Sequence, residues 1–267
     1  KVRRTFDIRA QPGFGLIALF TFFALYLPIA ALVAYSFNAA DSLSRWDGLS
    51  LRWFISAWNN SAVQDASIRS LILATWAATL ATIAATMAAL ATTRTPPYPG
   101  LTFKYAFINQ PLMVPEIVTG VALLIVFSRV KVWTGYSGLG YLILAHTAFC
   151  IPFAYLPIRA RLEGMDLTLE RAAADLYATP WRTFRHVTLP LLRPAIIAGF
   201  MLAFVISLDD VVITEFVKSG GQDTLPTYML GQLRRETSPE INAIATVFLA
   251  LSVLLVTVFY FVNRRRP

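Results

Sequence analysis

The stretch Glu170–Pro190 reads ERAAADLYATPWRTFRHVTLP and is polar and basic, although it lies between two long apolar segments. The chain has 267 residues, of which 57% are hydrophobic and only 14% are charged. A soluble domain usually carries about 25% charged residues. The stretch is therefore expected to be a loop outside a membrane, between two helices that cross it.

Apolar runs long enough for a bilayer recur along the chain. A transmembrane helix needs roughly 20 apolar residues, and no charge lies between Arg69 and Arg94 or between Lys131 and Arg159. A soluble protein with so many apolar runs would keep almost no polar residues for its surface. The sequence thus predicts an all-α integral membrane protein, a single transmembrane domain over residues 1–267 with spans near 14–36, 70–93, 105–128, 139–158, 194–217 and 241–262.

The placement of the basic residues predicts the orientation in the membrane. The net charge is +8, and with these spans and a cytoplasmic N-terminus, 15 of the 23 Lys and Arg residues fall in cytoplasmic segments. Cytoplasmic loops of membrane proteins carry such an excess. Both termini and the loop 159–193 are therefore expected in the cytoplasm. The first apolar run is expected to remain as a signal anchor.

Several function classes are disfavoured by the residues themselves. The basic residues form no soluble face of clustered Lys and aromatic side chains, so nucleic acid is not an expected partner. A single cysteine, Cys150, cannot form an internal disulfide. His146 is interpreted as a core histidine, because no His or Cys partner lies at metal-site spacing. The chain has no GxxxxGK(S/T) motif, so we expect no ATP site, cofactor or metal of its own.

Three acidic residues fall inside the predicted spans. An ionised Asp at the centre of a membrane helix costs about 2.5–3.5 kcal/mol, so it is either paired or faces water. Glu116 is expected near mid-bilayer, and Asp209 and Asp210 roughly 23 Å from the cytoplasmic end of their helix, at 1.5 Å per residue. Adjacent helical residues point about 100° apart, so both Asp side chains cannot face one path. The alternative is that an Asp pairs with an outer Arg, such as Arg69 or Arg129, or caps a backbone.

Within Glu170–Pro190 the residues predict two short helices joined near Tyr177. Asp166 is a suitable N-cap for the first helix, and Thr179-Pro180 supplies a cap and an N1 proline for the second. The run Ala172–Ala174 gives the first helix a slim face that permits close docking. Because a tyrosine at positive φ is costly, we expect the bend to be made in another way or Tyr177 to be a contact.

Glu170–Pro190 resembles the cytoplasmic EAA loop of ABC-transporter permeases. The motif of that family runs Glu-Ala-Ala, three residues, Gly, nine residues and Ile-x-Leu-Pro. Here Arg171-Ala172-Ala173 is followed at the same spacing by Tyr177 and by Val187-Thr188-Leu189-Pro190, with Arg171 in place of Glu and Tyr177 in place of Gly. Further segments resemble the second permease subunit of spermidine/putrescine-type importers, namely Tyr35–Asn38, Pro115–Gly120, Ser207–Ile213, Thr224–Pro226 and Ser238–Thr246.

The resemblance implies the type I ABC importer permease architecture and a transport subunit of the bacterial inner membrane rather than an enzyme. The implied partners are a homologous permease, two ATPase subunits, a periplasmic solute-binding protein and membrane lipid. The residues implied to dock the ATPase are Glu170, Arg171, Ala172, Ala173, Asp175, Tyr177, Ala178, Leu189 and Pro190. The residues expected to line the path of a small cationic solute, such as putrescine or spermidine, are Glu116, Asp209 and Asp210.

Other functions remain open on the sequence alone. Permeases of this type carry other small organic solutes, so an amino-acid derivative or an opine-like compound is an alternative substrate. An intramembrane enzyme is a second alternative, because Glu116 and Asp209 could form a pair of acids at depth. A non-transporting membrane scaffold is a third. Neither of the last two gives a purpose to the loop that resembles an ATPase-docking segment.

Overall fold

The computed structural model describes residues 14–42, 45–96, 98–235 and 238–264. Within these ranges the regular elements are helices, and an isolated antiparallel bridge joins Asn38 to Leu49. The elements are α1 (Phe14–Ser36), α2 (Arg52–Asn59), α3 (Ser61–Thr93), α4 (Leu101–Ile108), α5 (Gln110–Met113), α6 (Glu116–Thr134), α7 (Gly140–Glu163), α8 (Thr168–Asp175), α9 (Pro180–Thr183), the π-helical turn η1 (Phe184–Thr188), α10 (Leu189–Asp209), α11 (Val212–Val217), α12 (Leu225–Arg235) and α13 (Glu240–Arg264).

The described residues include 6 helices that are long and apolar enough to cross a membrane. These helices are Phe14–Ser36, Ser61–Thr93, Glu116–Thr134, Gly140–Glu163, Pro180–Asp209 and Glu240–Val258. The prediction of an all-α protein with six membrane helices is therefore confirmed, although the bounds of several helices differ from those expected. Which ends face the cytoplasm stays a prediction.

The chain divides by its contacts into two compact units, one made of Lys1–Asn60 and Gln232–Leu251 and the other of Ser61–Gly231 and Ser252–Pro267. The single transmembrane domain over 1–267 stays a prediction. In the first unit, the side chain of Asn38 organises the loop that follows α1, because its Oδ1 accepts hydrogen bonds from the backbone N–H groups of Ala40 (3.3 Å) and Asp47 (3.0 Å).

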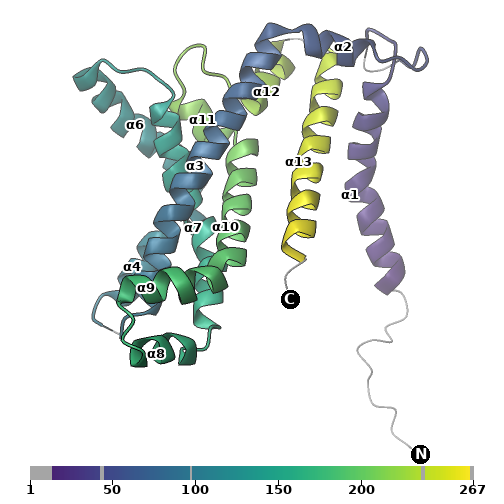
Figure 1. The fold of residues 1–267 in the computed structure, drawn as a ribbon. Helices are drawn as coiled ribbons and strands as arrows, with labels where there is room; N and C mark the ends of the chain where they lie inside the picture. The colour runs from purple at the N-terminus through teal and green to yellow at the C-terminus, as the bar shows by residue number, and fades with distance from the viewer. Residues whose placement is uncertain (1–13, 43–44, 97, 236–237, 265–267) are drawn as a thin grey trace, which may run out of the picture. The chain divides into compact units, whose positions relative to one another are not determined.

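The second unit has its core where α3, α7 and α10 pack along one another (Figure 1). Small residues dominate the buried face of α3, which allows close helix packing in lipid and includes Ala74, Ala77, Ala78, Ala81, Ala85 and Ala89. On α10, Gly199 faces the backbone of Ala154 on α7. In Figure 1, α8 and α9 lie at one end of these three helices and α11 lies at the other end.

The expected helix over 105–128 is replaced by α4, α5 and α6. Two prolines explain the difference: Pro111 is the second residue of the short α5, and Pro115 precedes α6 with Val114 in an extended conformation (ψ 135°), as a residue before proline favours. Glu116 is consequently the first residue of α6. Its expected position in the middle of a continuous helix was wrong.

The expected helix over 194–217 is also interrupted. α10 ends at Asp209, Asp210 is extended (ψ 134°), and α11 begins at Val212. The sequence analysis expected the two aspartates to lie on one continuous helix, and this expectation was wrong. They lie at a break, where each carboxylate can take a different direction.

Candidate functional site

Two regions of the second unit carry the residues singled out in the sequence. The first is Glu170–Pro190, called here the EAA-like segment, which forms α8, α9, η1 and the start of α10. The side chain of Asp166 accepts a hydrogen bond from the backbone N–H of Thr168 (2.9 Å), and its side-chain and backbone bonds with Thr168 lower the pKa of Asp166. The Oγ1 of Thr179 accepts from the N–H of Arg182 (3.4 Å) at the start of α9. The two short helices predicted here are α8 and α9.

The bend between α8 and α9 is made by Tyr177 itself. Its φ is 56°, the left-handed region that glycine occupies at lower cost. The N–H of Tyr177 bonds to the carbonyl of Ala174 (2.9 Å) and the N–H of Ala178 to the carbonyl of Ala173 (3.0 Å). This pattern is the Schellman motif that ends many helices. The expectation that the bend would avoid a positive φ was wrong, because these bonds hold the tyrosine in that conformation.

Apolar side chains of the EAA-like segment are exposed around this bend. The exposed fraction is 81% for Leu176, 95% for Tyr177 and 65% for Trp181. Arg171, Ala172 and several other members of the expected docking set are exposed as well, namely Asp175 and Pro190, while Ala173, Ala178 and Leu189 are partly exposed. Outside the bilayer, such a group of exposed apolar residues is typical of a surface that a partner protein covers.

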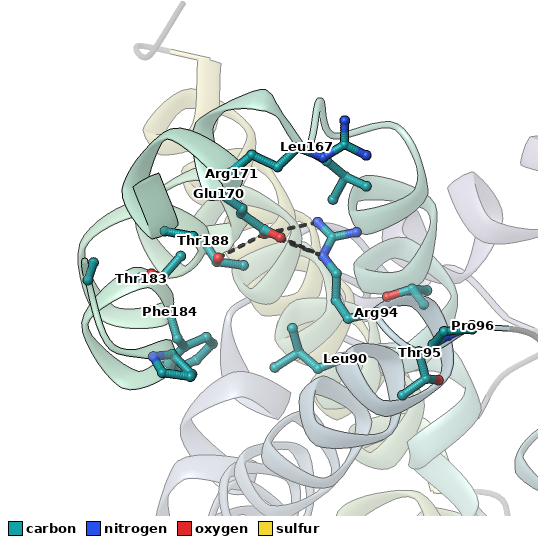
Figure 2. A pocket seen from close by; sticks show the side chains of 14 residues that line it. Leu90, Arg94, Thr95, Pro96, Leu167, Glu170, Arg171, Thr183, Phe184 and Thr188 are labelled. Carbon is teal, nitrogen blue, oxygen red and sulfur yellow. Dashed lines mark hydrogen bonds and ion pairs between the residues drawn. The ribbon is translucent and has the colours of Figure 1, made fainter. Parts of the chain in front are cut away.

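Glu170 is engaged within the chain rather than exposed. Its Oε2 lies 3.1 Å from Nε of Arg94, and its Oε1 accepts from Nη2 of Arg94 (3.1 Å) and from the hydroxyl of Thr188 (2.9 Å). Arg94 also donates to the carbonyl of Leu162 (3.0 Å). Figure 2 shows the guanidinium and the Thr188 hydroxyl meeting the same carboxylate. One side chain thus ties α8 to the end of α3 and to η1.

A cavity of about 680 Å³ opens beside this ion pair (Figure 2). Leu90 and Arg94 line it from the α3 side, Glu170 from α8, and Phe184 and Thr188 from η1. Most of the lining is apolar, and the cavity belongs to the same face as the EAA-like segment.

The second region is the break between α10 and α11. Oδ2 of Asp210 accepts from the N–H and the hydroxyl of Thr214, both at 2.9 Å, and Oδ1 accepts from the N–H of Ile213 (3.3 Å). The carboxylate is buried and caps the N-terminus of α11, where a negative charge is favourable. Asp210 therefore matches the alternative considered from the sequence, a carboxylate that caps a backbone.

Asp209 and Glu116 differ from Asp210 because both are exposed. Asp209 ends α10, Glu116 begins α6, and α11, which follows the break after Asp209, packs on α6. α11 packs closely on α6, because a Cβ added to Gly120 would lie 2.7 Å from the ring of Phe216. Gly120 follows Glu116 by four residues, hence on the same face of α6. The structure thus leaves both acids exposed at helix ends on either side of the packing between α11 and α6.

Sequence reasoning did not single out several residues that organise these regions. Arg94 and Thr188 bind Glu170, and Ser207 and Thr214 bind the ring nitrogens of the buried His146 (2.8 and 3.0 Å). The sequence does not reveal these pairs, because the two residues of each pair are at least 18 residues apart in the chain. His146 is a core histidine with both nitrogens bonded, as interpreted from the sequence.

Comparison with known proteins identifies relatives that match most of the chain. The family model described as "binding-protein-dependent transport system inner membrane component" matches residues 102–266. The putrescine transport system permease protein PotI of Escherichia coli (strain K12) is 38% identical over 236 residues, which cover 87% of this chain and 84% of PotI. The spermidine/putrescine transport system permease protein PotC of Haemophilus influenzae is 36% identical over 241 residues, which cover 90% of this chain and 92% of PotC.

Solved structures share the fold at lower identity. A chain of a bacterial ABC transporter involved in the import of the acidic polysaccharide alginate has a TM-score of 0.74 and 15% identity, over 94% of this chain and 93% of that chain. A chain of the MetNI methionine ABC transporter, in an inward-facing conformation, has a TM-score of 0.61 and 18% identity, over 73% of this chain and 92% of that chain. Both likenesses show the fold of an ABC importer permease.

Proposed function

Because this chain belongs to the family of binding-protein-dependent transport system inner membrane components, and is thus a permease subunit of an ABC importer, we propose that its substrate is a small cationic organic solute, such as putrescine or spermidine. The chain is a transport subunit of the inner membrane, and ATP hydrolysis belongs to a separate subunit. The proposed partners are a homologous permease, two ATPase subunits and a periplasmic solute-binding protein.

The observation that supports a cationic solute is the exposed acid pair Glu116 and Asp209. Two neighbouring carboxylates repel one another, and an ammonium group between them would relieve this repulsion. Charge-assisted hydrogen bonds from an ammonium to a carboxylate are also stronger than neutral ones. In this proposal Glu116 and Asp209 line the transport path. Asp210 instead stabilises the break between α10 and α11, because its carboxylate already accepts hydrogen bonds from Thr214.

The EAA-like segment is proposed to receive the ATPase and to pass its movement to the helices. η1 continues directly into α10, whose 21 residues lead from this segment to Asp209. At 1.5 Å per residue this helix spans about 30 Å, so a displacement at one end moves the acid at the other. The ion pair between Glu170 on α8 and Arg94, which directly follows α3, couples the movement of α3 to that of α8.

Neutralising the acid pair is expected to lower uptake without lowering assembly. Glu116→Gln and Asp209→Asn keep the shape of the side chain and remove its charge. We expect each to reduce the uptake of labelled putrescine per assembled complex roughly tenfold or more, because a hydrogen bond to a charged group contributes about 1.5–3 kcal/mol. Uptake is measured in membrane vesicles together with the amount and melting temperature of the complex.

The matched control is Asp65→Asn, which removes an exposed acid from the start of α3. Its uptake should remain near that of the unmodified complex. Normal uptake in both Glu116→Gln and Asp209→Asn, or a loss explained entirely by lower complex yield, would remove these acids from the path. If the same complex took up a neutral solute as fast as it takes up putrescine, the proposed cationic substrate class would be contradicted.

The proposed orientation follows from the charge bias and is tested by labelling. In a Cys150→Ser background, a cysteine at the exposed Arg182 should react with a membrane-impermeant maleimide only when the reagent is on the cytoplasmic side. A cysteine at the exposed Ser61, which begins α3, should react only from the opposite side. Labelling of both positions from one side would overturn the six-span topology.

A further inference from the structure

One buried side chain of α7 reaches both sides of the break between α10 and α11. His146 is fully buried, its Nδ1 lies 2.8 Å from Oγ of Ser207 in the last turn of α10, and its Nε2 lies 3.0 Å from Oγ1 of Thr214 in α11. The same Nε2 lies 3.4 Å from Oδ2 of Asp210. The imidazole thus joins two helices that the backbone leaves interrupted.

The bonding partners assign the protons of this network. The hydroxyl of Thr214 donates to Asp210, so its oxygen is left to accept from Nε2–H of His146. Nδ1 then accepts the hydroxyl proton of Ser207. A neutral imidazole is a donor at one nitrogen and an acceptor at the other, so one tautomer of His146 satisfies all the partners. A buried network with every member satisfied makes its elements rigid.

We propose that His146 is a positioning residue of the transport path, which fixes the α10–α11 break and thereby holds Asp209 beside Glu116. This inference rests on the proposed pathway role of Asp209. Asp209 ends α10 and is adjacent to Asp210, whose carboxylate caps α11, and α11 packs on the helix that begins with Glu116. Without the imidazole, α10 and α11 lose the hydrogen bonds that join both sides of the break to α7, so the break is held less firmly and the position of Asp209 changes with it.

The test compares His146→Leu, which fills the space without hydrogen bonding, with His146→Gln, whose amide can still donate to Thr214. In complexes with equal assembly, His146→Leu should raise KM for labelled putrescine uptake roughly tenfold, as expected when a buried hydrogen-bonded network is broken. His146→Gln should restore part of the difference. If the His146→Leu complex does not assemble, the test uses His146→Gln alone. A KM of the His146→Gln complex equal to that of the unmodified complex would then overturn the proposal.

A second readout does not depend on transport. Val211 lies in the break, so the thiol introduced by Val211→Cys, in a Cys150→Ser background, reports how open the break is. Its reaction rate with a small maleimide in the assembled complex should rise several-fold with His146→Leu. If Asp209→Asn leaves uptake intact while this rate still rises, His146 holds the break but the proposed path is wrong, so the two failures are distinguishable.

The matched control is Tyr155→Phe, on the same helix. Tyr155 is also fully buried, and its hydroxyl bonds to Oγ1 of Thr92 at 2.9 Å. It lies nine residues from His146, about 13 Å along α7 at 1.5 Å per residue. Tyr155→Phe should change neither KM nor the reaction rate at position 211. Equal effects of Tyr155→Phe and His146→Leu would reduce His146 to a general packing role and overturn the proposal.

Discussion

Replacing Gly199 with leucine is expected to prevent assembly of the permease. Gly199 is a residue of α10 that touches the backbone of α7: a Cβ added there would lie 2.8 Å from the carbonyl oxygen of Ala154 and 3.2 Å from its Cα. A backbone cannot move aside as a flexible side chain can, so α10 and α7 would have to separate. Overpacking of a well-packed core costs about 1–3 kcal/mol, and we expect the upper end or more.

The measurement is the amount of complex in the membrane and its melting temperature. Gly15→Leu is the matched control, because Gly15 also lies in a helix and an added Cβ would meet nothing within 4 Å. Gly15→Leu should leave the complex yield unchanged. A Gly199→Leu complex with the yield and melting temperature of the control would show that the contact between α10 and α7 is not as close as described.

Replacing Leu176 with aspartate is expected to abolish ATP-driven uptake while the membrane fold survives. Leu176 precedes the bend at Tyr177, and its side chain is 81% exposed, so the fold of this chain loses little. A buried charge without a partner in an interface costs several kcal/mol, which is enough to detach an ATPase. Ala173→Asp should act in the same direction, because Ala173 lies on the slim face of α8.

The measurements are co-purification of the ATPase, ATP hydrolysis and uptake of labelled putrescine. Leu49→Asp is the matched control, since Leu49 is equally exposed at 81% and the predicted topology places it on the opposite side of the membrane. It should leave ATPase binding unchanged. A Leu176→Asp complex that retains its ATPase and transports at the normal rate would show that the EAA-like segment does not couple the subunits.

Features that depend on local residue order were predictable from the sequence. The membrane helices follow from the length of apolar runs. Thr179 is the N-cap of α9 as expected, whereas the N-cap of α8 is Leu167, one residue after the expected Asp166, whose side chain still accepts from the N–H of Thr168. The resemblance to the EAA loop rests on spacing within 21 residues, and relatives over most of the chain confirmed the family. The expected bounds failed where hydropathy was used without weighing Pro115 as a helix terminator.

The roles of individual polar residues were decided only by the tertiary structure. Asp209 and Asp210 are adjacent and identical in the sequence, yet Asp209 is exposed and Asp210 caps α11, because the break turns their side chains apart. Glu170 stands within the EAA-like segment, yet its carboxylate is bound by Arg94, which directly follows α3 and lies 76 residues away in the sequence.

The physical reason is the range of the interactions. Hydropathy and capping act within a few residues of the chain, so a single sequence contains them. A hydrogen bond or an ion pair is directional and short, so its formation depends on which helices meet and at what rotation. The sequence by itself determined a six-helix inner-membrane permease that contains the EAA-like segment. Only the packing of α3, α6, α7, α10 and α11 decided that Asp209 and Glu116 stay exposed while Glu170, Asp210 and His146 are bound within the chain.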